Sequence, residues 1–165
     1  MDNFIKKIIK DCLSDQEAWI TPTFAKCTFI SRNRDATANY GFEWVIQTAF
    51  SEFLLKKQKD LKISGIKITQ EDAENKKRYD IAFHFEGSLV IIELKTSSKG
   101  DTSGVKSDME KPYPFRKKVG GRYFLLFCYP FDDGKNNDIA GADLIDLGIT
   151  HCVFKYFLYK DRSFS

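Results

Sequence analysis

Three residues in the middle of the chain, Asp80, Glu93 and Lys95, have the types and the spacing that metal-assisted hydrolysis would need. Twelve residues separate Asp80 from Glu93, and a single residue separates Glu93 from Lys95. Carboxylate oxygens are ligands that Mg²⁺ prefers, and a nearby ammonium group can orient a water molecule or neutralise developing negative charge. The fold must bring these three side chains together for such chemistry to occur.

A β-hairpin is the element that would do so. The segments 78–85 and 88–96 have the composition of strands, and a two-residue loop at Glu86-Gly87 joins them. One face of this hairpin is wholly apolar, so we expect it to lie in the interior of a sheet. The residues of that face are Ile81, Phe83, Phe85, Val90, Ile92 and Leu94.

In the register that this loop sets, Asp80 lies directly opposite Glu93, with Cβ atoms about 4.5 to 5.5 Å apart. Lys95 joins the same face because side chains alternate along a strand. Two facing carboxylates in an apolar interior repel each other and lose hydration, and a divalent cation is the simplest compensation. The alternative is an ordinary strand-end ion pair between Glu93 and Lys95, which leaves the position of Asp80 unexplained.

The order of Asp80, twelve residues, and Glu93-Leu94-Lys95 resembles the motif of the PD-(D/E)XK nuclease superfamily, which has the restriction-endonuclease-like fold. The resemblance implies that Asp80 and Glu93 bind Mg²⁺, with Mn²⁺ as a substitute. It also implies that the backbone carbonyl of Leu94 joins the metal and that Lys95 is catalytic. Tyr79 stands where the family motif often has a proline, a position without a chemical duty.

The resemblance further implies a glutamate on the helix before the first core strand, and the chain offers Glu43 and Glu52 there. The apolar stripe of that helix is centred near Ile46. At about 100° per residue, Glu43 lies roughly 60° from Ile46 and Glu52 about 120° away. We therefore expect Glu43 to be a further catalytic acid and metal ligand.

The remaining elements follow from hydrophobic periodicity and turn residues. They predict an α/β fold, a restriction-endonuclease-like mixed β-sheet flanked by helices, in one nuclease domain over 1–165 with its core at about 38–159. Residues 14–36 are ambiguous, Gly120-Gly121 is predicted to be a turn and 70–77 a loop. Helices are expected at 2–13, 38–57, 105–111 and 139–147, and strands at 61–69, 78–85, 88–96, 123–129 and 152–159.

Other residue types offer no competing chemistry. The four cysteines lie far apart without a C-x-x-C pair, so zinc is not expected. His84 shares the acid-bearing face deeper in the hairpin, and we expect it to be a packed core histidine. His151 has no nearby acid, so no Ser-His-Asp or Cys-His arrangement is predicted.

Composition sets the class of protein. With 165 residues, 42% of them hydrophobic and 30% charged, the chain can build the core of one globular domain. The longest apolar run, 123–131, is too short to cross a bilayer, and 1–13 lacks the unbroken apolar centre of a secretory signal. We therefore expect a cytoplasmic protein without a membrane partner.

Basic residues concentrate after the hairpin. The chain has a net charge of only +3, but Lys95 to Arg122 holds eight basic residues and three acidic ones. Such a run is either a solvated face or a surface that contacts phosphates. In the second interpretation, Lys99, Lys106 and Lys111 are the candidate nucleic-acid contacts, because they follow the catalytic strand directly.

Together these features favour a magnesium-dependent endonuclease that hydrolyses phosphodiester bonds in DNA, in restriction or in defence against phage and mobile elements. Cutting both strands would favour a homodimer. Two alternatives remain: an RNA-cleaving toxin or processing nuclease with the same site, and a non-catalytic nucleic-acid-binding subunit of the same fold. An inhibitor or immunity-type interaction protein is a further alternative.

Overall fold

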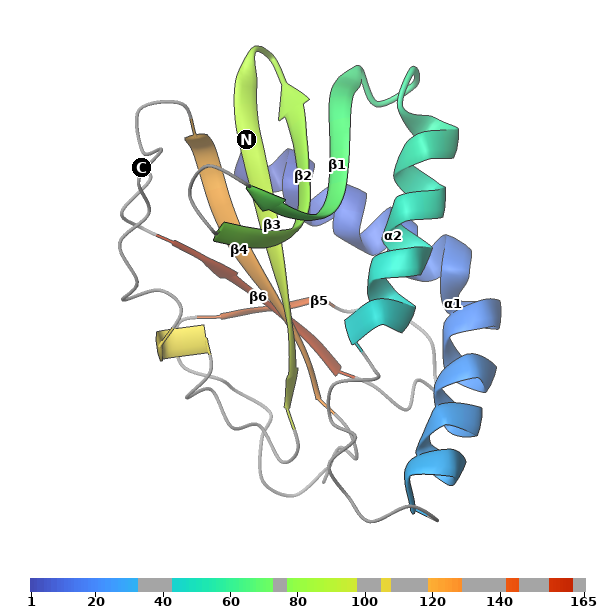
Figure 1. Ribbon diagram of the computed structural model, residues 1–165. Helices are drawn as coiled ribbons and strands as arrows, with labels where there is room; N and C mark the ends of the chain where they lie inside the picture. The colour runs from blue at the N-terminus through green and yellow to red at the C-terminus, as the bar shows by residue number, and fades with distance from the viewer. Residues whose placement is uncertain are drawn as a thin grey trace.

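The computed structural model describes residues 1–32, 43–72, 77–97, 105–107, 119–128, 142–145 and 155–161. These residues form two long helices and a six-stranded mixed sheet in the order β1-β2-β3-β4-β6-β5 (Figure 1). The helices are α1 (Asp2–Arg32) and α2 (Glu43–Lys57). The strands are β1 (Ile63–Asp72), β2 (Lys77–Phe85), β3 (Ser88–Ser97), β4 (Val119–Cys128), β5 (Asp143–Ile145) and β6 (Lys155–Lys160).

The predicted hairpin is present as β2 and β3, and its register is confirmed. Phe85 pairs with Ser88, and the antiparallel ladder continues in that register to Ile81 and Ile92. The two loop residues have left-handed backbones, with φ of 50° at Glu86 and 78° at Gly87. Positive φ at both positions is the conformation of a type I′ turn, whose twist matches that of the strands it joins.

Beyond the hairpin, β3 pairs in parallel with β4, which makes the sheet mixed. The prediction of a turn at Gly120-Gly121 is wrong, because both glycines lie in β4. A Cβ at Gly120 would lie 2.5 Å from the Cβ of Ser88, and one at Gly121 would lie 2.8 Å from the ring of Tyr123. These glycines therefore permit close packing inside the sheet rather than a reversal of the chain.

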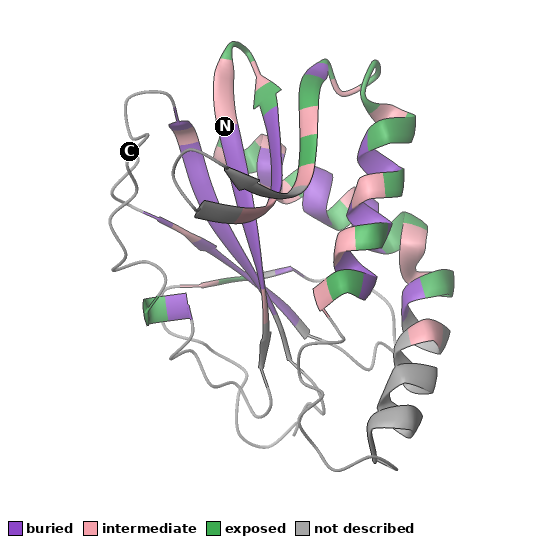
Figure 2. Ribbon diagram, in the orientation of Figure 1, coloured by how far each residue is buried: buried purple, intermediate pink, exposed green. Residues whose placement is uncertain are grey.

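One face of the sheet carries the main core, and both long helices pack against it (Figure 1). Figure 2 shows the central strands buried along most of their length. The apolar face predicted for the hairpin lies here and is confirmed, with Phe85 only partly buried. From the helices, Ile5, Ile8 and Ile9 of α1 and Ile46 and Phe50 of α2 contribute to the same core.

The opposite, acid-bearing face has two smaller apolar clusters. Ala82 and Ile91 pack with Val119 at the hairpin. Phe124 and Phe157 pack with Val105 of the helical segment 105–107, which lies in the connection between β3 and β4. The mixed sheet therefore has helical segments on both of its faces.

Several predicted boundaries are wrong. Helix α1 runs past Pro22 to Arg32, although proline disfavours a helix interior because it lacks the N–H donor. Strand β1 continues to Asp72, so the start of the predicted loop 70–77 belongs to the sheet. The predicted helix 139–147 contains β5 instead. No helix in the described part of the chain has the length and apolarity needed to span a bilayer.

The core assignment predicts a large difference between two truncations. Phe83 is fully buried between the sheet and the helices, whereas Leu55 is 54% exposed on α2. We expect Phe83→Ala to lower the free energy of unfolding by about 3 to 5 kcal/mol, and Leu55→Ala by less than about 1 kcal/mol. Urea denaturation of both variants measures this difference, and equal losses would contradict the packing described above.

Candidate active site

The hairpin opens at the end that carries the acids. Asp80 and Glu93 come next in the register, but the ladder ends at Ile81 and Ile92. Instead of a backbone pair, the Oδ2 atom of Asp80 accepts a hydrogen bond of 2.6 Å from the backbone N–H of Leu94. The carboxylate of Asp80 is thereby fixed beside the backbone of β3 at the point where the two strands separate.

Helix α2 reaches the same point. The Nε2 atom of Gln47 donates a hydrogen bond of 2.9 Å to the backbone carbonyl of Asp80. This bond ties the first turns of α2 to β2, one residue beyond the end of the β2–β3 ladder. The backbone of Asp80 is therefore held from the helix while its side chain is held by β3.

Glu93 is an ionisable group in an apolar setting. Only 7% of Glu93 is exposed to solvent. The pKa of its carboxyl is raised from 4.5 to about 7, mainly by burial and next by repulsion from Asp80, while the charges of Arg122 and Lys95 oppose the shift. The hydrogen bond from the N–H of Leu94 holds the carboxylate of Asp80 beside the residue that follows Glu93, and its negative charge disfavours ionisation of Glu93.

Arg122 is the site residue that the sequence interpretation missed. Its Nη2 atom lies 3.3 Å from Oε1 of Glu93, and its Nη1 atom lies 3.6 Å from Oδ2 of Asp161. Its guanidinium carbon lies 4.7 Å from the centre of the Phe124 ring. Arg122 was counted in the basic surface run, but only 5% of it is exposed, so it belongs to the interior.

Lys95 is half-buried on β3, two residues after Glu93 and therefore on the same face. Its positive charge opposes the raised pKa of Glu93, although burial and Asp80 outweigh it. A cation near two carboxylates could stabilise a phosphate that approaches them. The structure thus brings Asp80, Glu93 and Lys95 to one region.

The third predicted acid, Glu43, lies at the start of α2. Glu43 begins α2 one turn before Gln47 and is half-buried, whereas Glu52 is exposed. Among the described residues, however, no group of three or more His, Cys, Asp or Glu side chains is arranged to hold a metal ion. The structure therefore does not bring Glu43 together with Asp80 and Glu93 as a three-carboxylate ligand set.

The donor atoms at the opened hairpin are nevertheless those that Mg²⁺ prefers. Asp80 and Glu93 supply carboxylate oxygens, and Leu94, which follows Glu93 and bonds Asp80 through its N–H, supplies a backbone carbonyl. Glu93 already has a cationic partner in Arg122, so an ion bound there would have to share this carboxylate or replace the guanidinium. The oxygen donors therefore suit the predicted Mg²⁺ ion, and Arg122 would compete with that ion for the carboxylate of Glu93.

The other predicted residues have different outcomes. Lys106 is exposed, as a phosphate contact requires. Lys99 and Lys111 lie outside the described residues. The prediction that His84 is a packed core residue is wrong: it is exposed and lies over β1, where a Cβ at Gly65 would be 2.9 Å from its Nδ1 atom.

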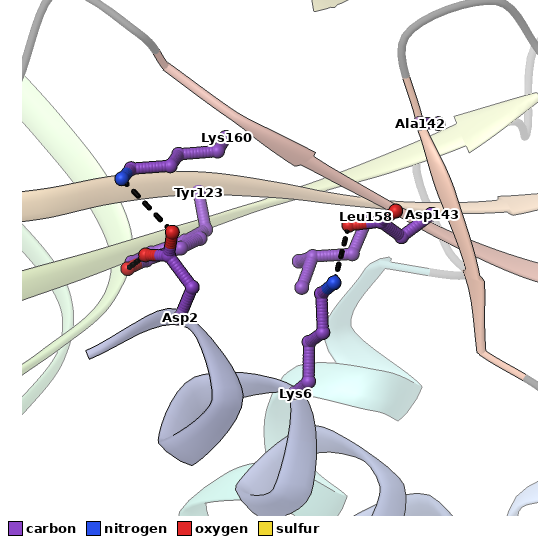
Figure 3. A pocket seen from close by; sticks show the side chains of 7 residues that line it. All are labelled: Asp2, Lys6, Tyr123, Ala142, Asp143, Leu158 and Lys160. Atoms are coloured by element: carbon purple, nitrogen blue, oxygen red, sulfur yellow. Dashed lines mark hydrogen bonds and ion pairs between the residues drawn. The ribbon is translucent and has the colours of Figure 1, made fainter. Parts of the chain in front are cut away.

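A pocket of about 320 Å³ lies on the α1 side of the sheet (Figure 3). Two ion pairs line it: Lys6 with Asp143 at 2.7 Å and Lys160 with Asp2 at 3.0 Å. Asp2 also accepts a hydrogen bond of 2.8 Å from the hydroxyl of Tyr123. Since two lysines and two aspartates give these side chains no net charge, the pocket is a weaker candidate for phosphate chemistry than the opened hairpin.

The environment of Glu93 predicts a pH effect on stability in the absence of metal. Because the folded protein holds this proton more tightly than the unfolded chain, ionising Glu93 should lower stability as the pH rises from 4.5 to about 7. The loss should be about 3 kcal/mol relative to Glu93→Gln. Urea unfolding of both proteins across this range, with a chelator present, measures the difference, and parallel profiles would contradict a raised pKa.

Comparison of the chain with protein-family models, with curated proteins and with solved structures found no match. The assignment of a function therefore depends on the motif and on the geometry of Asp80, Glu93, Lys95 and Arg122.

Proposed function

We propose that this protein is a magnesium-dependent endonuclease that hydrolyses phosphodiester bonds in DNA, with a restriction-endonuclease-like fold. One observation supports the proposal most: the carboxylate of Asp80 accepts a hydrogen bond from the backbone N–H of Leu94, beside Glu93, whose pKa is raised by burial and by the charge of Asp80. Two repelling carboxylates at the open end of a buried hairpin form a site that a divalent cation would stabilise.

In this proposal Asp80, Glu93 and the carbonyl of Leu94 hold Mg²⁺ or Mn²⁺, with Glu43 as a further acid from α2. The ion, when bound, polarises the phosphoryl group and promotes ionisation of water. Gln47 keeps the backbone of Asp80 in place through its bond to the carbonyl. The ammonium group of Lys95 orients the attacking water and offsets the negative charge that develops on the phosphate oxygens.

The choice of DNA rests on the sequence motif and on the basic residues that follow β3. Lys106 is exposed, and with Lys99 and Lys111 it would contact the phosphate backbone. A homodimer would supply one site for each strand, and restriction or defence against phage and mobile elements is the proposed setting. Because carboxylate-metal chemistry does not distinguish the sugars, an RNA substrate is the alternative within the same mechanism.

A second function is favoured by a specific observation. Arg122 already places a cation 3.3 Å from Glu93, so the site has a partner for that carboxylate without metal. A nucleic-acid-binding subunit of the same fold that has lost catalysis would retain such an ion pair as a structural element. Its nucleic-acid binding would then survive the loss of Lys95.

Cleavage assays with site variants test the proposed function directly. Supercoiled plasmid, linear DNA and RNA are incubated with the protein and Mg²⁺, beside Asp80→Ala and Lys95→Ala. We expect both variants to lose about 10²- to 10⁴-fold in cleavage rate, because each removes a group that acts on the reacting phosphate. Lys67→Ala, which removes an exposed charge from β1, is the control and should keep its rate.

The outcomes separate the candidates. Cleavage of RNA alone would select the RNA nuclease. Binding of nucleic acid without cleavage, unchanged in Lys95→Ala, would select the non-catalytic subunit. Cleavage that persists at the wild-type rate in both site variants would remove the site assignment.

The two acids of α2 give a matched pair for the role of Glu43. Glu43→Gln and Glu52→Gln make the same change in charge on the same helix, but only Glu43 is half-buried near the turn that contacts Asp80. We expect Glu43→Gln to lower the cleavage rate by at least about tenfold and Glu52→Gln to leave it unchanged. Equal rates for the two variants would exclude Glu43 from the site.

A further inference from the structure

Arg122 joins two buried carboxylates that lie on different elements. It reaches Glu93 of β3 at 3.3 Å and Asp161, directly after β6, at 3.6 Å. The backbone N–H of Asp161 also donates a bond of 2.9 Å to the carbonyl of Arg122. Both acids are at most 7% exposed, so solvent contributes little screening to either contact.

The guanidinium is a permanent charge, because arginine stays protonated at any pH at which the protein is folded. It is also anchored against the face of the Phe124 ring at 4.7 Å. A divalent ion that binds Glu93 therefore meets a fixed positive charge that bonds the same carboxylate. Asp161 is the other acceptor that Arg122 can retain while it releases Glu93.

Building on the proposed function, we propose that Arg122 is a positioning residue that holds Glu93 while the site is free of metal and competes with the ion for this carboxylate. Asp161 is the second acceptor, which draws the guanidinium away from Glu93. Arg122 acts through Glu93 and does not itself contact the substrate. The pair Arg122–Asp161 thereby sets how tightly the site binds its metal.

This arrangement predicts opposite effects for the two members of the pair. Arg122→Gln removes the competitor and should tighten Mg²⁺ binding at least about threefold. Asp161→Asn removes the second acceptor, so Arg122 stays with Glu93 and Mg²⁺ binding should weaken by a similar factor. Both variants disturb a buried ion pair, so both should lose stability. Loss of structure alone would shift the two affinities in the same direction.

The measurement is titration calorimetry of Mg²⁺ without nucleic acid, repeated with Mn²⁺ by electron paramagnetic resonance. Matched controls lie on the opposite face of the sheet, in the Asp2–Lys160 and Lys6–Asp143 pairs (Figure 3). Lys160→Gln and Asp143→Asn repeat the two changes in charge away from Glu93 and should leave the metal affinity within about twofold of wild type. Arg122→Lys keeps the positive charge, so its metal affinity should stay close to that of the wild type. It serves as the second variant if Arg122→Gln folds poorly.

Each result decides the inference. Opposite shifts for Arg122→Gln and Asp161→Asn, absent from the controls, support it. If the wild type binds Mg²⁺ and Arg122→Gln binds it equally or more weakly, the role of Arg122 is overturned. The nuclease proposal then still stands. No uptake of either ion by the wild type or any variant overturns the role of Arg122, and the cleavage assay with Mg²⁺ then decides the nuclease proposal separately.

Discussion

The repulsion between Asp80 and Glu93 is the constraint that organises this molecule around its candidate site. Two carboxylates at the open end of a hairpin, with one of them buried, are unfavourable unless hydrogen bonds and cations compensate. The structure supplies those compensations from three elements, β3, α2 and β4. The backbone of β3 binds Asp80, α2 binds the carbonyl of the same residue, β4 contributes Arg122, and Lys95 adds a second positive charge.

The mixed pairing of the sheet brings Arg122, one of these compensating charges, to the site. The parallel pairing of β3 with β4 places Phe124 beside Glu93 and brings Arg122, two residues earlier, to the same face. The antiparallel pairing of β4 with β6 then places Asp161 next to Arg122. Neighbouring residues of the same strands, Tyr123 and Lys160, point to the other face and bind Asp2 at the start of α1. The strands thus carry one polar network on each face.

What could be predicted from the sequence was mainly local. The hairpin register followed from a two-residue loop and from alternating side chains, both of which depend on residues close together in the chain. Arg122 could not be assigned, because its contact with Glu93 depends on a parallel pairing between strands whose order the sequence does not state. A Gly-Gly pair predicts a turn, but the role of Gly120 and Gly121 is to permit close contacts with Ser88 and Tyr123. These contacts exist only in the folded sheet, so the sequence alone does not show them. Strand β5 has three residues, too few for a periodic pattern.

The central claim is that the carboxylates of Asp80 and Glu93 share a divalent ion. The most direct measurement is a crystal structure of the protein grown with Mn²⁺, with diffraction collected at a wavelength where manganese scatters anomalously. If the two carboxylates share the ion, we expect an anomalous peak at coordinating distance from both of them, and a guanidinium of Arg122 displaced from Glu93 toward Asp161. An Arg122–Glu93 contact that persists unchanged at saturating Mn²⁺, with no peak between the two acids, would contradict this claim.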